Sequence, residues 1–164
     1  MTDKDQMEQG AEAQMTAAEK KRLAAFNTNA LAFMGDAVYE VYIRQHVMAG
    51  GASSAEKLHF MAVKYVRADG QAKALRTMQS DGFLSEEEAA LVRRARNRKI
   101  SSKPKNAGVM DYKLATAFEA LVGYLYLAGE EERLQQVMAE AVRIIEDKHL
   151  EDKHLENKNR ENKQ

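Results

Sequence analysis

The 164-residue sequence contains no cysteine, a single proline and nine glycines. Without cysteine the chain can form no disulfide, no thiolate metal site and no cysteine nucleophile, and a reducing cytoplasm is the expected compartment. A sheet protein needs turn residues about every 8–12 positions, and this chain has too little proline and glycine to supply them. Since helix-forming residues dominate nearly everywhere, the fold is predicted to be all-α.

The chain also lacks a long apolar run and a net charge. No segment approaches the roughly 20 apolar residues that cross a membrane, and the polar N-terminus is unlike a signal peptide, so no membrane partner is expected. The 25 basic and 25 acidic residues cancel, which excludes a uniformly basic surface of the kind that coats nucleic acid. At about 150 residues per domain, the length predicts one domain.

Two charged ends flank this predicted domain. Residues 1–15 show no helical apolar stripe and are expected to form a disordered tail. Near the other end, Glu-Asp-Lys-His-Leu occurs at 146–150 and again at 151–155. A period of five matches neither 3.6 nor 3.5, so the leucines of this repeat cannot line up as a stripe. The predicted organisation is a tail over 1–15, a helical domain over 16–148 and a charged repeat tail over 149–164.

Helix starts and stops are marked along the domain. Capping boxes are predicted at Thr16, Ser53 and Ser85, each followed three residues later by a glutamate. Glycines supply the stops after three of the helices. Gly70 is the predicted weak point of the longest helix. The predicted helices cover 16–25, 28–48, 54–79, 86–98, 111–128 and 131–148.

The predicted helices 28–48 and 111–128 are apolar on nearly all sides, which is typical of a core or a subunit interface. Each carries a carboxylate in its apolar stretch, Asp36 in one and Glu119 in the other. A buried ionised carboxylate needs a positive or hydrogen-bonding partner. Either arginines from other helices form salt bridges with these acids, or the two acids share a divalent cation such as Mg²⁺ or Mn²⁺. Glu40, one turn after Asp36, would support such a site or form an ion pair.

The second signal is a basic segment that runs from position 93 to position 106. It holds seven basic residues and no acidic one, so the rest of the neutral chain carries an equal negative charge. Such a cluster on a helix end and the adjoining loop predicts contact with a phosphate backbone. Favourable interaction with the helix dipole accounts for two or three of these charges, not for all seven. They are Arg93, Arg94, Arg96, Arg98, Lys99, Lys103 and Lys105.

Together these motifs resemble the ribonuclease III catalytic domain. Residues 33–38, Phe-Met-Gly-Asp-Ala-Val, are similar to the family's signature helix, Phe-Leu-Gly-Asp-x-Val. Residues 118–127 resemble its second acidic helix, whose glutamate also binds metal. Arg-Ala-Arg-Asn at 94–97, followed by Lys-Pro-Lys-Asn at 103–106, fits the basic loop of the branch that lacks a double-stranded-RNA-binding domain. The resemblance covers roughly residues 27–146.

The resemblance implies a homodimeric, α-helical endoribonuclease that hydrolyses double-stranded RNA with Mg²⁺ and leaves 5′-phosphate ends. It also implies maturation of the 23S ribosomal RNA precursor as the cellular task. By the same resemblance, Asp36 and Glu119 are the catalytic and metal-binding residues, and Ala32 and Thr116 stand where larger members carry two further acids. The residues expected to bind RNA are Arg94, Arg96, Asn97, Lys99, Lys103 and Lys105.

Three other functions are compatible with the same residues. In the first, the chain is a non-catalytic module that binds duplex RNA, such as a ribosome-assembly factor, and its acids are structural. In the second, it is a different all-α hydrolase, such as a nucleotide pyrophosphohydrolase. Those enzymes usually place several acids on one helix, whereas this chain offers only Asp36 and Glu40. In the third, it is a helical scaffold that is indifferent to metal and RNA.

Overall fold

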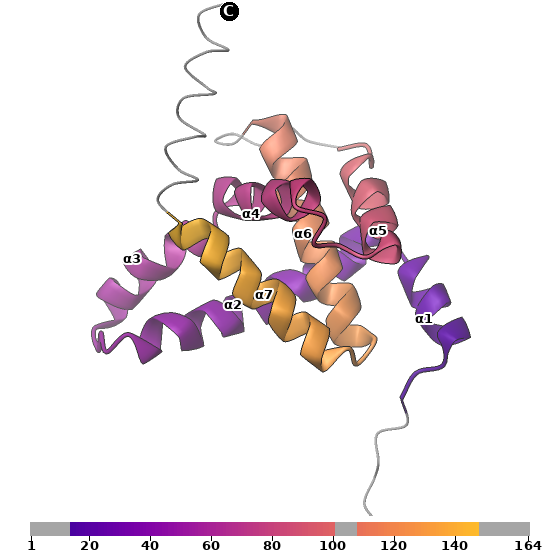
Figure 1. The fold of residues 1–164 in the computed structure, drawn as a ribbon. Helices are drawn as coiled ribbons and strands as arrows, with labels where there is room; N and C mark the ends of the chain where they lie inside the picture. Colours follow the sequence, from indigo (N-terminus) through magenta and orange to yellow (C-terminus); the bar gives the residue numbers. More distant parts are fainter. Residues whose placement is uncertain (1–13, 101–107, 148–164) are drawn as a thin grey trace, which may run out of the picture.

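The computed structural model describes residues 14–100 and 108–147, which contain seven α-helices and no strand (Figure 1). The prediction of an all-α fold is therefore confirmed. No helix within these ranges is long and apolar enough to cross a membrane. The helices are α1 (Ala17–Ala24), α2 (Thr28–Ala49), α3 (Ala55–Val66), α4 (Ala68–Ser80), α5 (Glu86–Arg96), α6 (Val109–Leu127) and α7 (Glu131–Glu146).

The prediction of one long helix over 54–79 is wrong, because the chain turns at Arg67 between α3 and α4. Arg67 has an extended backbone, with ψ at 150°, and it is both the C-cap of α3 and the N-cap of α4. Gly70 is not the break. A Cβ at Gly70 would lie 2.3 Å from the carbonyl oxygen of Lys64, so glycine allows the first turn of α4 to approach the end of α3.

The other predicted boundaries agree closely with the structure. The capping boxes at Thr16 and Ser85 are both present. The helix expected to start at Ser53 begins one residue later, because the Ser54 hydroxyl accepts the hydrogen bond that caps α3. Three of the expected glycine stops have the positive φ that glycine adopts without strain. These are Gly51 at 88°, Gly82 at 67° and Gly129 at 70°.

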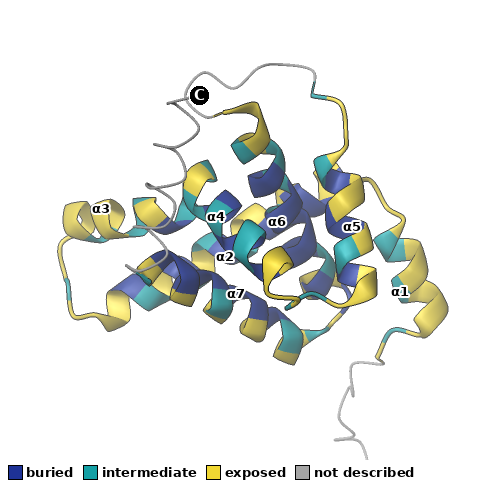
Figure 2. Ribbon diagram, turned by 45° about the horizontal axis from the view of Figure 1, so that its top comes forward, coloured by how far each residue is buried: buried dark blue, intermediate teal, exposed yellow. Residues whose placement is uncertain are grey.

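α6 is the central helix of the fold. It runs through the middle of the molecule, with α4 and α5 packed on it and α2 crossing it (Figure 1), and most of its length is buried (Figure 2). The crossing of α2 and α6 is very close. A Cβ on Gly35 would lie 1.7 Å from the backbone oxygen of Glu119, and one on Gly123 would lie 1.9 Å from the backbone oxygen of Leu31. Only glycine at these two positions allows the backbones to meet.

The sequence predicts that the two apolar helices lie in a core or at a subunit interface, and α6 fits the core, since none of its residues from 113 to 125 is exposed. One face of α2 is buried in the core through residues such as Leu31, Tyr39 and Ile43. Its other face exposes large apolar side chains, among them Phe33 at 82% and Val41 at 58%. The free apolar face of α2 is therefore available to a partner.

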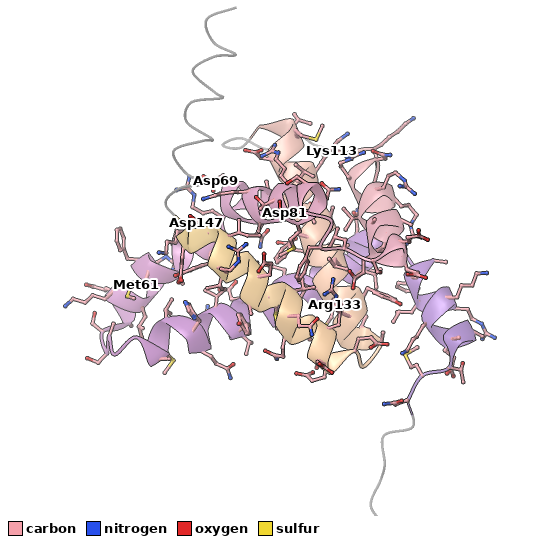
Figure 3. All side chains as sticks on the ribbon, in the orientation of Figure 1. Met61, Asp69, Asp81, Lys113, Arg133 and Asp147 are labelled. Carbon is pink, nitrogen blue, oxygen red and sulfur yellow. The ribbon has the colours of Figure 1, made fainter. Side chains whose placement is uncertain are left out.

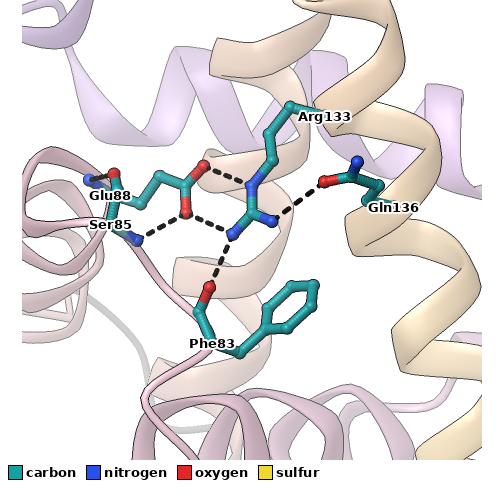
Figure 4. Close-up of polar contacts among 5 residues, drawn as sticks. All are labelled: Phe83, Ser85, Glu88, Arg133 and Gln136. Atoms are coloured by element: carbon teal, nitrogen blue, oxygen red, sulfur yellow. Dashed lines mark hydrogen bonds and ion pairs between the residues drawn. The ribbon is translucent and has the colours of Figure 1, made fainter.

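A partly buried ion pair joins α5 to α7 (Figure 4). Arg133 donates to both carboxylate oxygens of Glu88, at 2.8 and 2.9 Å, and to the backbone oxygen of Phe83 at 2.7 Å. Burial acts to raise the pKa of Glu88, but the hydrogen bonds from Arg133 and from the backbone of Ser85 outweigh it and hold that pKa below its usual value. Because every polar group is paired, this contact fixes the position of α5, from which the basic segment extends.

Candidate active site

A cavity of about 340 Å³ opens where α2, α6 and the C-terminal end of α5 meet, and both predicted acids line it. The cavity brings together residues from three parts of the sequence. They include Ala32 and Asp36 from α2, Thr116 and Glu119 from α6, and Arg98 and Lys99 from the segment that follows α5.

Helical spacing and the close helix crossing together explain this arrangement. Ala32 and Asp36 are four residues apart and Thr116 and Glu119 are three apart, so each pair lies on one face of its helix. Gly35, next to Asp36, contacts the backbone of Glu119 at the crossing. The two helix faces therefore meet at the cavity. Ala32 and Thr116, which stand where larger family members carry acids, line the same cavity as Asp36 and Glu119.

The two acids differ in burial. Glu119 is largely enclosed, whereas Asp36 is exposed, so the expectation that both carboxylates are buried is wrong for Asp36. Burial, and then the negative charge of Asp36, raise the pKa of Glu119 to about 7. Partial burial, and then the charge of Glu40, raise the pKa of Asp36. Asp36 therefore ionises first, and its charge opposes ionisation of Glu119.

No arginine or lysine in the described part of the chain forms an ion pair with either acid. The alternative of structural salt bridges therefore has no support there. Glu40, in contrast, pairs with Arg44 at 2.8 Å and does not line the cavity. This contact favours the ion-pair interpretation of Glu40 over a supporting role at the cavity.

The cavity suits a hard divalent cation. Asp36 and Glu119 offer carboxylate oxygens, and their raised pKa values reflect a repulsion and a burial that a cation would offset. Across residues 14–100 and 108–147, no group of three or more histidine, aspartate or glutamate side chains could hold a metal. A Mg²⁺ or Mn²⁺ ion would therefore take its other oxygen ligands from water and from a substrate phosphate, which Mg²⁺ commonly does.

Glu119 should make the metal-free protein less stable as pH rises from about 5 to 8. Between its usual pKa of 4.5 and the folded value of about 7, the folded state binds more protons than the unfolded state. The free energy of unfolding therefore falls as pH rises through this range. The total fall is on the order of 3 kcal/mol and is complete once the pH exceeds the folded pKa. Thermal unfolding in EDTA at pH 5, 6, 7 and 8 measures this slope.

A matched pair of variants assigns the slope to its source. Glu119→Gln should flatten the profile and raise the melting temperature at pH 8. Glu56→Gln removes the same charge from an exposed position on α3 and should leave the slope as it is. An unchanged slope in Glu119→Gln would contradict the assignment.

The predicted RNA-binding residues do not all gather at the cavity. Lys99 lines it. Arg94 is instead bonded to the backbone oxygens of Ala24 and, at 3.3 Å, of Phe26, so it holds the connection between α1 and α2. Arg96 lines a separate cavity between α5 and the turn before it.

The remaining predicted residues lie at or beyond the end of α5. Asn97 is the C-terminal cap of α5, and its side-chain oxygen accepts from Arg96 Nε at 3.3 Å. Lys103 and Lys105 lie outside the described residues.

Sequence reasoning did not single out three polar residues that line the cavity: Asn29, Tyr112 and Lys113. Lys113 lies near the start of α6 (Figure 3). Helical spacing could have identified all three. Asn29 precedes Asp36 by seven residues, and Tyr112 precedes Glu119 by seven, so they share the faces of the two acids, with Lys113 beside Tyr112. Arg98, which belongs to the predicted basic segment, also lines the cavity and donates to the side chains of Asn27 at 2.5 Å and Thr28 at 3.5 Å.

Comparison with known proteins gives a consistent result. A model of the ribonuclease III domain matches residues 29–130. A protein named Mini-ribonuclease 3 from Brevibacillus brevis is 47% identical over 120 residues, which cover 73% of this chain and 88% of that protein. The Mini-ribonuclease 3 of a Thermoanaerobacter species is 44% identical over 128 residues, which cover 78% and 89%.

A solved structure supports the same assignment. The crystal structure of a protein from Fusobacterium nucleatum matches with a TM-score of 0.65 and 31% sequence identity, covering 72% of this chain and 93% of that one. The family model, the relatives and the fold agree with the two motifs that meet at the cavity. The chain therefore belongs to the ribonuclease III family, in its Mini-ribonuclease 3 branch.

Proposed function

We propose that this chain is a Mg²⁺-dependent endoribonuclease that hydrolyses double-stranded RNA, leaves 5′-phosphate ends and processes the 23S ribosomal RNA precursor in the cytoplasm. Membership of the family supports the nuclease activity. The observation that carries the proposal is the placement of Asp36 and Glu119 in one cavity, without ion pairs from the described residues and beside a group of cations. Mn²⁺ is expected to replace Mg²⁺.

In this proposal the two acids and the surrounding cations have different tasks. Asp36 and Glu119 hold the divalent ion, which when bound supplies an activated water and neutralises charge at the scissile phosphate. Arg98, Lys99 and Lys113, which line the same cavity, attract the phosphate backbone and hold it over the acids. Recognition of A-form RNA depends mainly on shape, phosphates and 2′-hydroxyls, so these cations need little sequence preference.

The other residues that were expected to bind RNA have different roles in this proposal. Arg94 already donates to two backbone oxygens, so its main contribution is to anchor the end of α5. Arg96 and Asn97 offer contacts beside the cavity rather than within it. Lys103 and Lys105 are proposed to extend the basic surface along the duplex.

A homodimer is proposed from the exposed apolar side chains of α2 and α3. Phe33 and Phe60 are each 82% exposed, and Met48 is 61% exposed. Exposed apolar surface of this extent commonly marks an interface. Because Phe33 also lines the cavity, a partner that covers it would lie beside the acids. A two-fold axis would then present two cavities to the two strands of a duplex. Sedimentation equilibrium measures the oligomeric state.

The decisive experiment is incubation of the protein with a long RNA duplex, with Mg²⁺ or with EDTA, followed by gel analysis of fragment sizes and end groups. The proposal expects discrete shorter duplexes with 5′-phosphates in Mg²⁺ and intact RNA in EDTA. A ribosome-assembly factor would instead bind the duplex and leave it intact in both. Accumulation of unprocessed 23S precursor in cells depleted of the protein tests the cellular substrate.

Replacing Lys99 and Lys113 by alanine should weaken binding of duplex RNA and reduce its dependence on salt. Each lost phosphate contact should flatten the plot of log affinity against log salt by about 0.7–0.9. Binding is measured in EDTA by fluorescence anisotropy at several salt concentrations. Lys57→Ala, an exposed position on α3, removes one charge away from the cavity and should leave the slope unchanged. Equal slopes in all the variants would exclude phosphate contact at the cavity.

A further inference from the structure

Gln71 is a polar side chain buried where α4 packs against α6. It is 1% exposed, and its Nε2 has no hydrogen-bond partner among the described residues. Unpaired amides of this kind are rare in protein interiors, because burial without a partner is unfavourable. A methionine of similar length would fill the same space without that penalty. The amide at position 71 therefore calls for an explanation other than stability.

The Gln71 side chain lies beside the Glu119 carboxyl. Burial and the charge of Asp36 raise the pKa of Glu119, and the side chain of Gln71, which is within hydrogen-bonding reach of the carboxyl, acts in the opposite direction. Its Nε2 is nevertheless outside hydrogen-bond geometry with every described residue. The fold explains why the two side chains meet. After the turn at Arg67, α4 runs across α6 (Figure 1). Gln71 lies one turn into α4, where its backbone N–H donates to the Arg67 backbone oxygen at 3.1 Å.

We propose that Gln71 is a positioning residue for Glu119. Its Nε2 donates a hydrogen bond to the ionised Glu119 carboxylate and fixes which oxygen faces the cavity. The inference rests on the proposed function, because this orientation matters only where Glu119 binds a divalent cation. Groups that orient a metal-binding carboxylate in this way commonly change metal affinity or activity by about 10–100-fold.

The test compares Gln71→Met with Tyr39→Phe. The Tyr39 hydroxyl is the other buried side-chain atom without a partner in the described ranges. Its ring packs edge-to-face on Phe118, with the ring centroids 4.9 Å apart. Burial, and then the neighbouring Tyr42 and Tyr65, raise the pKa of its hydroxyl, and neither acid of the cavity contributes. Each substitution thus removes one unpaired polar group and keeps the size of the side chain. Only one of the two groups lies at the site.

Both variants should raise the melting temperature of the metal-free protein by about 2–6 °C, because each removes a buried unpaired group. Only Gln71→Met should weaken Mn²⁺ binding by about tenfold, measured by electron paramagnetic resonance without RNA. In Mg²⁺ it should lower kcat by a similar factor, while the affinity for duplex RNA in EDTA stays within about twofold.

Three results would overturn the inference. A lower melting temperature in Gln71→Met would show that the amide is satisfied within the fold and is structural. A higher melting temperature with unchanged Mn²⁺ binding and kcat would show that the amide does not orient Glu119. Failure of the unchanged protein to bind Mn²⁺ would overturn the inference together with the metal site. Weaker Mn²⁺ binding in Gln71→Met, with no RNA cleavage by the unchanged protein, would support the inference and refute the nuclease.

Discussion

Replacing Asp36 by asparagine should reduce cleavage of a long RNA duplex by about a thousandfold or more, while binding of the same RNA stays within about twofold. Among the described residues, Asp36 is one of two carboxylates that line the cavity, so its loss removes half of the carboxylate ligands that these residues offer a cation. Asparagine keeps the shape of the side chain. Because Asp36 is exposed and forms no ion pair with the described residues, its loss should not unfold the protein.

Single-turnover cleavage in Mg²⁺ and anisotropy in EDTA separate the two effects of this change. Glu40→Gln removes a charge one turn away on the same helix and is the informative comparison. Since the Glu40 carboxylate is bonded to Arg44 and lies outside the cavity, cleavage by this variant should stay within about threefold of normal. If Asp36→Asn cleaved RNA at the normal rate, Asp36 would not be part of the site. If Asp36→Asn and Glu40→Gln lost cleavage equally, Glu40 would also belong to the site.

Much of this site could be predicted from the sequence, because its acids stand out in apolar surroundings. Asp36 and Glu119 each interrupt an apolar helix, and the motifs around them match one family. Periodicity alone could not show that they meet, since it describes each helix separately. Their meeting depends on the crossing at Gly35 and Gly123, where two backbones come within reach only without a Cβ. A glycine in an apolar helix does not reveal which partner approaches it.

The sequence predicted the role of the basic segment as a whole, but not the role of each basic residue. The charge density of the segment indicated a polyanion, yet Arg94 is bonded to the connection between α1 and α2. That contact joins positions about seventy residues apart, so no local pattern predicts it. The break at Arg67 was missed for a related reason. The sequence offered Gly70 as the weaker helix former, but the position of α4 against α6 and α7 decides where the chain turns.

The close crossing of α2 and α6 leads to the second large expected effect, on stability. Gly35→Ala should lower the free energy of unfolding by about 3 kcal/mol or more. The added Cβ would lie 1.7 Å from the Glu119 backbone oxygen and 2.7 Å from the Gly123 backbone nitrogen. Backbone atoms in the middle of a buried helix cannot rotate away as a side chain can. The helices would have to separate, which would open the core and move Asp36 away from Glu119.

Urea-induced unfolding measures the loss, and Gly108→Ala is the matched control. Gly108 caps the start of α6 with φ at −56°, and a Cβ there meets no atom within 4 Å, so its stability should change by no more than about 1 kcal/mol. If Gly35→Ala still folds, Mn²⁺ binding should weaken along with stability, because one contact sets both the packing and the distance between the acids. Stability close to that of the unchanged protein would mean that the crossing can yield, and that something other than this glycine holds the two carboxylates together.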